Sequence, residues 1–187
     1  MQPLVNPSEL MVDFEIAIHR AFTSVFPNCS IVGCLFHLGQ SLYQKTTDLV
    51  LRGKYKSESD FCLKVRCFSA LAFLSVADVE EAYEELTDDD EIPGEFISYF
   101  GVNYMGVVRG HGRRRRREPP LFPMELWNVN NRIVNNLPRT NNALEGYHSS
   151  LKLGATHPNI WRLIKSLENE TGLIQTKITH IHRGDIQ

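Results

Sequence analysis

The start of the chain alternates apolar runs with polar stops in a way that predicts a strand, a helix and a second strand. Residues 9–13, ELMVD, form a short apolar run stopped by Asp13, which is typical of a buried strand. Residues 14–26 place apolar side chains at helical spacing, and Pro27 ends this run. Residues 29–34, CSIVGC, predict another short strand. The opening segment therefore reads as strand, helix, strand.

From residue 35 onward the hydrophobic pattern is mainly helical. Helices are expected within residues 35–51, 60–74, 75–86, 94–108 and, as an amphipathic helix that closes the chain, 157–178. A break is expected at RGKYKSES, residues 52–59. One or two strands cannot form a sheet with both faces buried. The chain is then either mainly helical with a minor hairpin or the continuation of a larger α/β fold, and the early position of the first strand favours the second.

Composition and charge are consistent with one globular domain. The chain has 187 residues, of which 42% are hydrophobic, so it is long enough to bury its own core. The net charge of −2 conceals an acidic block over residues 78–91 and five consecutive arginines, Arg113, Arg114, Arg115, Arg116 and Arg117. The arginine run is either a solvated loop or a segment for phosphate contact or nuclear targeting.

Membrane association and disulfide bonding are not expected. No apolar run approaches membrane-spanning length, and the first residues lack the features of a signal peptide. The four cysteines, Cys29, Cys34, Cys62 and Cys67, are expected to be reduced and buried, as in an intracellular protein. Trp127 and Trp161 are expected to be core or helix-packing residues.

The stretch LPRTNNALEGYHSSLK, residues 137–152, carries the most informative group of polar residues. As a helix it would place Leu144, Tyr147 and Leu151 on one face and Glu145, His148, Ser149 and Lys152 on the other. A structural interpretation makes Glu145 the second half of a capping box begun by Asn142. A functional interpretation makes it a metal ligand.

Asp13 allows the same two interpretations. It directly precedes the first helical segment, so it could cap that helix. It also follows an apolar strand, and open α/β sheets bind ligands beyond the carboxyl ends of their strands.

Three segments in this order resemble the catalytic region of Mutator-like element (MULE) transposases. They are VDFEIAIHRAF, VGCLFHLGQSLYQK and FPMELWNVNNRIVNNLPRTNNALEGYHSSLK. The resemblance runs from about residue 10 to about residue 165. These transposases belong to the DDE group and have an RNase H-like fold. The resemblance implies an α-rich α/β protein with an incomplete RNase H-like fold, in which one or two strands remain.

The resemblance also assigns roles to individual residues. Asp13 matches the second catalytic aspartate and Glu145 the terminal glutamate of the family. Cys34 and His37 match its Cys-x-x-His signature, and His148 is a candidate for contacting phosphate or orienting water, or a structural histidine. The five arginines and Lys152 are candidate DNA contacts. Residues 38–123 resemble the helical insertion and basic loop that separate the last two acids.

The implied chemistry is two-metal phosphoryl transfer on DNA. Carboxylates are suitable ligands for Mg²⁺ or Mn²⁺, and two such ions activate a nucleophile and stabilise the leaving oxygen. Asp13 and Glu145 lie 132 positions apart (145 − 13), so only tertiary folding can bring them together. The family's first aspartate has no counterpart before Asp13, where the only acid is Glu9. We therefore expect an N-terminally truncated transposon-derived protein, nuclear and inactive alone.

Two other classes of function remain open. The chain could be a non-catalytic DNA- or chromatin-binding protein that places its arginine run on phosphates. It could also be a helical protein-interaction module in which neither acid binds metal. A homo-oligomer is possible in each case. A structural zinc site that uses Cys34 and His37 is disfavoured, because the cysteine and histidine spacing does not resemble a standard finger.

Overall fold

The structure is a computed structural model that describes residues 6–88, 90–109, 116–142, 146 and 159–184. The chain divides into two compact units, residues 1–141 and 142–187, and each is considered by itself. The prediction of one domain over the whole chain stays a prediction.

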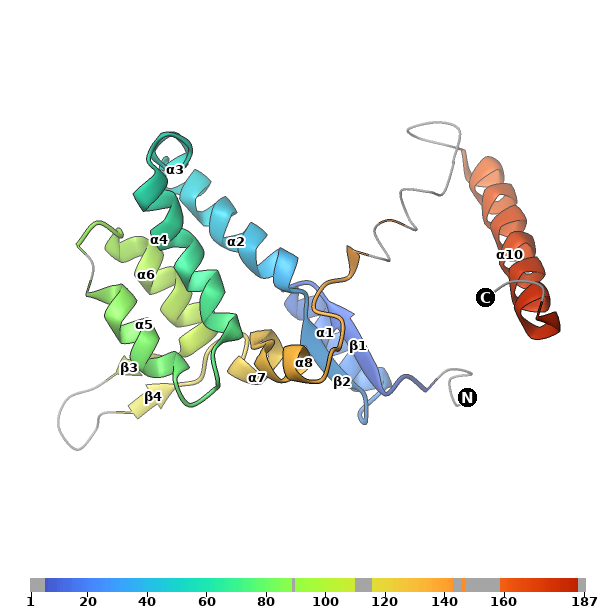
Figure 1. Cartoon of the computed structure of the whole chain (residues 1–187), viewed down its shortest axis with the longest axis horizontal. Coiled ribbons are helices and arrows are strands. Elements are labelled where there is room, and N and C mark those ends of the chain that lie inside the picture. Colours follow the sequence, from blue (N-terminus) through green and yellow to red (C-terminus); the bar gives the residue numbers. More distant parts are fainter. Residues whose placement is uncertain (1–5, 89, 110–115, 143–145, 147–158, 185–187) are drawn as a thin grey trace. The chain divides into compact units, whose positions relative to one another are not determined.

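The first unit begins with the predicted strand–helix–strand segment. Strand β1 (Glu9–Val12) pairs in parallel with β2 (Ser30–Gly33), and helix α1 (Ile16–Val25) connects them. The register aligns Glu9 with Ser30 and Val12 with Gly33, so both strands end at the same edge of the sheet. Helix α2 (Leu35–Asp48) starts directly after β2 and leads away into a group of helices (Figure 1).

The helices of the first unit surround an aromatic core. After α2 come α3 (Arg52–Ser57), α4 (Ser59–Ala70), the 3₁₀ turn η1 (Leu71–Phe73), α5 (Val79–Thr87), α6 (Gly94–Phe100) and the π-helical turn η2 (Gly101–Met105). Phe68, Phe100 and Trp127 are almost fully buried there. The indole Nε1 of Trp127 donates a hydrogen bond to the carbonyl of Tyr104 at 3.1 Å, which confirms the expected core role of Trp127. Helix α3 lies where the sequence suggested a break.

A β-hairpin follows the helices. Strand β3 (Val107–Arg109) pairs antiparallel with β4 (Arg116–Glu118). Gly106, which opens the hairpin, has φ of +82°, and a Cβ there would lie 2.5 Å from the carbonyl oxygen of Glu118. The expectation that the whole arginine run lies in a loop is therefore wrong for its last two residues, which lie in β4. Helices α7 (Met124–Trp127) and α8 (Asn130–Val134) then return the chain to the first sheet.

The second unit contains one long helix in its described part. Helix α10 (Ile160–Arg183) begins after Asn159, whose side chain accepts a hydrogen bond from the backbone N–H of Arg162 at 2.9 Å. It ends at Gly184, which adopts the left-handed conformation typical of a helix C-terminus. Trp161 is 77% exposed in this helix, so the core alternative of its expected core or helix-packing role is wrong.

The chain is thus mainly helical with a few short strands, which supports the α-rich α/β class. The finer assignment to an RNase H-like fold stays a prediction. No helix within the described ranges is long and apolar enough to cross a membrane.

Candidate functional site

The candidate site is built around Asp13, the first residue after β1. Its carboxylate Oδ1 lies 2.9 Å from Nδ1 of His37 and accepts a hydrogen bond from Nδ2 of Asn141 at 3.3 Å. The Asp13 side chain is 47% exposed, whereas that of His37 is 17% exposed. The imidazole and the amide therefore hold a carboxylate that solvent can still reach.

Asp13 does not cap the first helix. The N-cap residue of α1 is Glu15, and no side chain makes a capping hydrogen bond there. The backbone carbonyl of Asp13 instead accepts hydrogen bonds from the backbone N–H of Glu15 at 2.8 Å and from Nε2 of His19 at 2.9 Å. The structural interpretation of Asp13 as a helix cap is therefore wrong.

The Cys-x-x-His pair reaches the same place from the start of α2. Cys34 is fully buried, and its backbone N–H bonds to the carbonyl of Val12 at 2.9 Å, directly beside Asp13. Its thiol donates to Oδ1 of Asn141 at 3.2 Å. His37 is three residues further on, close to one helical turn, so both side chains lie on the side of α2 that faces the strand ends.

A third segment, residues 137–141, is attached to the site by backbone and side-chain hydrogen bonds. The backbone N–H of Leu35 donates to the carbonyl of Arg139 at 2.9 Å. The backbone N–H of Asn141 lies 3.5 Å from the Cys34 sulfur. Asn141 thus contacts both Cys34 and Asp13, and the chain just before residue 142 lies at the carboxyl end of the sheet.

Arg132 in α8 fixes this segment to the first strand. Its two terminal nitrogens lie 2.7 and 2.9 Å from the carboxylate oxygens of Glu9, and its Nε donates to the carbonyl of Pro138 at 2.6 Å. The Arg132 hydrogen bonds lower the pKa of Glu9 below its usual value. We call the set Glu9, Arg132 and Pro138 the arginine clamp. Arg132 is only 8% exposed, whereas the Glu9 side chain is 41% exposed, so solvent reaches the clamp on its Glu9 side.

Sequence reasoning missed Asn141 and the arginine clamp. Asn141 stands in the quoted stretch LPRTNNALEGYH, but nothing in its type distinguishes it from Asn142. Glu9 differs from its sequence neighbours only in being the single acid before Asp13. Its contact with Arg132 spans 123 residues, and no sequence spacing indicates it.

Several predicted site residues lie outside the described part of the chain. These are Glu145, His148 and Lys152, and also Arg113, Arg114 and Arg115. The capping box proposed for Asn142 and Glu145 lies there too, because Glu145 belongs to it.

The two described arginines of the run have acidic partners. Arg117 forms an ion pair with Glu80 of α5 and donates a hydrogen bond to the carbonyl of Met105 at 3.3 Å. Arg116 lies 3.7 Å from Glu118, which also pairs with Arg109 at 2.8 Å. These side chains are between 39% and 79% exposed, so the ion pairs are screened by solvent and weak.

The donor atoms at the site suit a hard cation only in part. Asp13 contributes carboxylate oxygen, the ligand type that Mg²⁺ and Mn²⁺ prefer. Among the residues that the structure describes, no group of three or more His, Cys, Asp or Glu side chains could hold a metal ion. The family resemblance assigns a further carboxylate, Glu145, to this role, and Glu145 lies outside the described residues.

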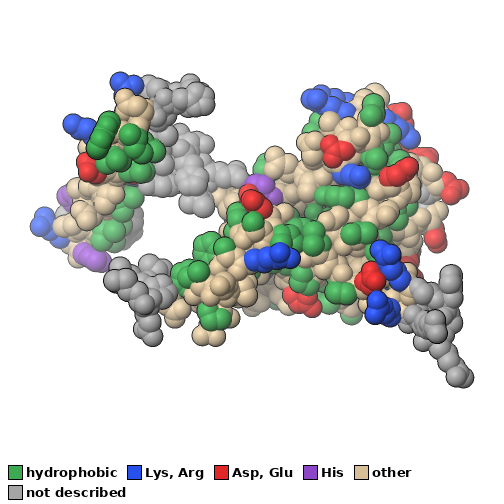
Figure 2. All heavy atoms as spheres, turned by 180° about the vertical axis from the view of Figure 1, so that it is seen from behind, with side chains coloured by type: hydrophobic (Ala, Val, Ile, Leu, Met, Phe, Trp, Pro, Cys, Tyr) green, Lys and Arg blue, Asp and Glu red, His purple; other side chains and the backbone are tan. Residues whose placement is uncertain are grey.

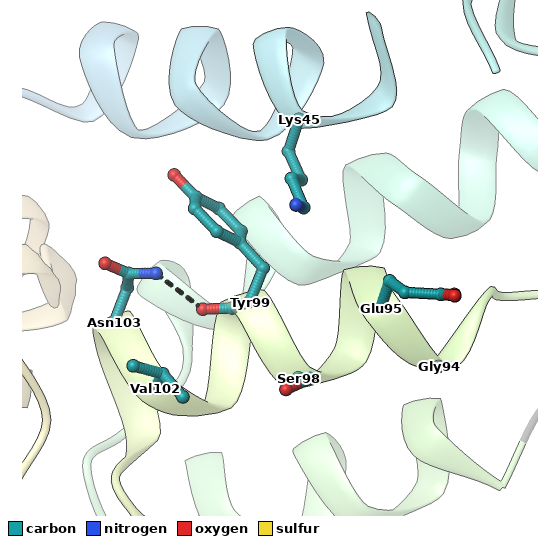
Figure 3. Close-up of a pocket in the computed structure, with 7 residues that line it drawn as sticks. All are labelled: Lys45, Gly94, Glu95, Ser98, Tyr99, Val102 and Asn103. Carbon is teal, nitrogen blue, oxygen red and sulfur yellow. Dashed lines mark hydrogen bonds between the residues drawn. The ribbon is translucent and has the colours of Figure 1, made fainter. Parts of the chain in front are cut away.

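A separate hollow of about 640 Å³ lies between α2 and α6 (Figure 3). The ammonium of Lys45 points from α2 toward Tyr99, 5.3 Å from the ring centre. The side chain of Asn103 donates to the carbonyl of Tyr99 at 2.7 Å. Lys45 follows His37 by eight residues, about 12 Å along the helix, so this hollow is distinct from the Asp13 site.

Comparison of the chain with protein-family models, curated proteins and solved structures finds no match.

Proposed function

We propose that this chain is a transposon-derived protein similar to part of a MULE transposase catalytic core. In this proposal Asp13 and Glu145 are two of the carboxylates that hold Mg²⁺ or Mn²⁺ for DNA strand cleavage and transfer. The sequence matches two of that family's three acids, so we expect the chain to be inactive by itself. DNA is the expected partner and the nucleus the expected compartment.

The observation that carries the proposal is the position of Asn141 beside Asp13. The two side chains are 128 residues apart in sequence and are joined by a hydrogen bond of 3.3 Å. Glu145 follows Asn141 by four residues, and four residues of extended chain span at most about 14 Å. The Asn141–Asp13 contact, together with this chain length, therefore sets an upper limit on the distance between Glu145 and Asp13.

The surroundings of Asp13 also favour a role in metal binding. His37 and Asn141 both contact Oδ1, so the carboxylate has a fixed orientation. Polar neighbours in contact with a metal-ligating side chain commonly orient it and tune its basicity. When bound, the metal pair would polarise the scissile phosphate and activate the attacking hydroxyl or water. In this chain His37 and Asn141 are the positioning residues, and Cys34 in turn holds Asn141.

The test is a Mn²⁺ titration of the full chain, followed by electron paramagnetic resonance of free Mn²⁺. Asp13→Asn and Glu145→Gln should each weaken Mn²⁺ binding at least about 10-fold, since one carboxylate can supply roughly 1.4 kcal/mol or more to a shared site. Asp48→Asn is the matched control. Asp48 is exposed on α2, 11 residues or about 16 Å beyond His37, and its loss should leave binding unchanged.

Iron-directed cleavage tests whether the two acids share one ion. Fe²⁺ replaces Mg²⁺ at oxygen-rich sites, and with ascorbate and peroxide it cuts the backbone near the bound ion. Cuts near both Asp13 and Glu145, lost together in Asp13→Asn, are expected. Cuts near one acid only, or a Glu145→Gln protein that binds Mn²⁺ as wild type, would refute the metal-binding proposal.

A salt series with duplex DNA separates the remaining alternatives. If the chain binds DNA through its arginine run, the logarithm of the affinity should fall linearly with the logarithm of the salt concentration. Substitution of Arg113, Arg114 and Arg115 together should reduce that slope. Salt-dependent DNA binding without Mn²⁺ binding would favour a non-catalytic DNA-binding protein. A chain that binds neither Mn²⁺ nor DNA would favour a protein-interaction module.

A further inference from the structure

Helix α10 carries an apolar stripe with the spacing of a coiled coil. The stripe positions alternate steps of four and three residues along the helix. They are Ile160, Ile164, Leu167, Thr171, Ile174, Ile178 and Ile181. An average step of 3.5 residues keeps such a stripe facing one partner helix over its whole length. In heptad notation Ile164, Thr171 and Ile178 are a positions, and the others are d positions.

This stripe is exposed within the described part of the chain. No residue of α10 is buried. The six apolar members of the stripe are between 38% and 60% exposed. Hydrophobic side chains are visible along this helix in Figure 2. The helix has 24 residues and is therefore about 36 Å long, enough for three heptads.

The charges beside the stripe select the orientation of a partner. Glu170 and Lys177 both occupy g positions, which flank the seam of a coiled coil. In an antiparallel pair g positions face each other, so Glu170 of each copy meets Lys177 of the other. In a parallel pair a g residue faces the e residue five positions later, which places Glu170 opposite Gln175 and Lys177 opposite His182. Only the antiparallel pair joins opposite formal charges.

The apolar layers fit the same arrangement. If the helices cross between residues 172 and 173, every a residue faces a d residue of the other copy. Ile164 then faces Ile181, Leu167 faces Ile178, and Thr171 faces Ile174. The polar Thr171 at a central a position disfavours shifted registers, because a shift would place its hydroxyl elsewhere in the apolar seam. The opposed helix dipoles also favour antiparallel packing.

From this combination of register and charge we propose that α10 is a dimerisation helix whose partner is α10 of a second copy of this chain, in antiparallel orientation. The pairing is self-complementary, as a twofold symmetric contact requires. It goes beyond the proposed metal chemistry and does not depend on it.

Sedimentation velocity of the full chain over a concentration range of about 1 to 200 µM tests dimer formation. Wild type should form a dimer that dissociates on dilution. Ile174→Asp should weaken the dimer at least about 10-fold by placing a charge in the seam. Leu173→Asp is the matched control, because Leu173 lies next in sequence but at a c position, away from the seam. The Leu173→Asp dimer should dissociate over the same concentration range as the wild-type dimer.

Charge exchange tests the orientation without disturbing the apolar seam. Glu170→Lys and Lys177→Glu should each weaken self-association roughly 5- to 30-fold, because two attractive contacts become repulsive. An equimolar mixture of the two variants should regain wild-type association, since each exchanged side chain then faces an opposite charge on the other variant. Circular dichroism checks that each variant keeps its helix.

Three results would overturn the proposal. The first is a chain that stays monomeric throughout the concentration range, which would mean that the stripe is covered within the same molecule. The second is equal dissociation of the Ile174→Asp and Leu173→Asp dimers. The third is a mixture of charge variants that associates no better than either variant alone.

Discussion

The arginine clamp gives a prediction whose size can be worked out from its contacts. Arg132→Met keeps the length of the side chain and its apolar stem but removes every donor to Glu9 and Pro138. The Nε bond to the Pro138 carbonyl is part-buried and charge-assisted, and charge-assisted bonds contribute about 1.5–3 kcal/mol. Glu9 is 41% exposed, so its ion pair is discounted for solvent screening to about 0.2–1 kcal/mol. The free energy of unfolding should fall by about 2–4 kcal/mol.

Urea denaturation followed by tryptophan fluorescence measures this change. Trp161→Phe serves as the background, so that the signal comes only from Trp127, which is 1% exposed in the core of the first unit. Glu9→Gln keeps a hydrogen-bond acceptor and loses only the charge, so its effect should be smaller, about 0.2–1 kcal/mol. Arg132→Met should cost more than Glu9→Gln, because only Arg132→Met also removes the hydrogen bond to the Pro138 carbonyl.

Arg20→Met provides the control. Arg20 is exposed on α1, and its replacement should change the unfolding free energy by less than about 0.5 kcal/mol. If Arg132→Met has an effect no larger than this control, the clamp contributes nothing measurable and the reasoning is wrong. If the clamp holds as described, Arg132→Met should also weaken Mn²⁺ binding, because the segment that carries Asn141 loses its anchor.

Two further predictions concern pH and packing. The pKa of Glu9 in the folded chain is lowered from 4.5, so its pair with Arg132 contributes stability above about pH 4.5. This stability is lost as the pH falls through the lowered pKa. Urea unfolding midpoints measured from about pH 6 to 3 should show the loss in wild type and not in Arg132→Met. Gly33→Ala should cost about 1–3 kcal/mol in thermal unfolding, because the new Cβ would lie 2.7 Å from a ring carbon of Phe14. Gly39→Ala, where the Cβ meets nothing within 4 Å, should instead stabilise α2 by about 0.5–1 kcal/mol.

The sequence was sufficient for the segment that presents Asp13. The short apolar run before Asp13, the helical spacing up to Pro27 and the CSIVGC run are local signals, and β1, α1 and β2 follow them within two or three residues. The family resemblance singles out Asp13, Cys34 and His37 as site residues. All three residues do lie together.

The remaining features depend on tertiary contacts that no local pattern indicates. Strand β4 consists of Arg116, Arg117 and Glu118, a sequence with no β-type alternation, and its ion pairs with other elements help to hold it. Likewise Asn141 reads as one of several asparagines in a polar stretch. Its role appears only once Cys34 and Asp13 are brought beside it.

The long sequence separation of the arginine clamp sets an order of events during synthesis on the ribosome. Strand β1 emerges early, but Glu9 must wait for a partner 123 residues later, and Asp13 for one 128 residues later. Until those residues leave the exit tunnel, Glu9 lacks its final partner and Asp13 has His37 but not Asn141. A nascent chain stalled before Arg132 would therefore contain the strand–helix–strand segment, the helical core and the His37 contact to Asp13, yet still lack the Asn141 contact to Asp13 and the partner of Glu9.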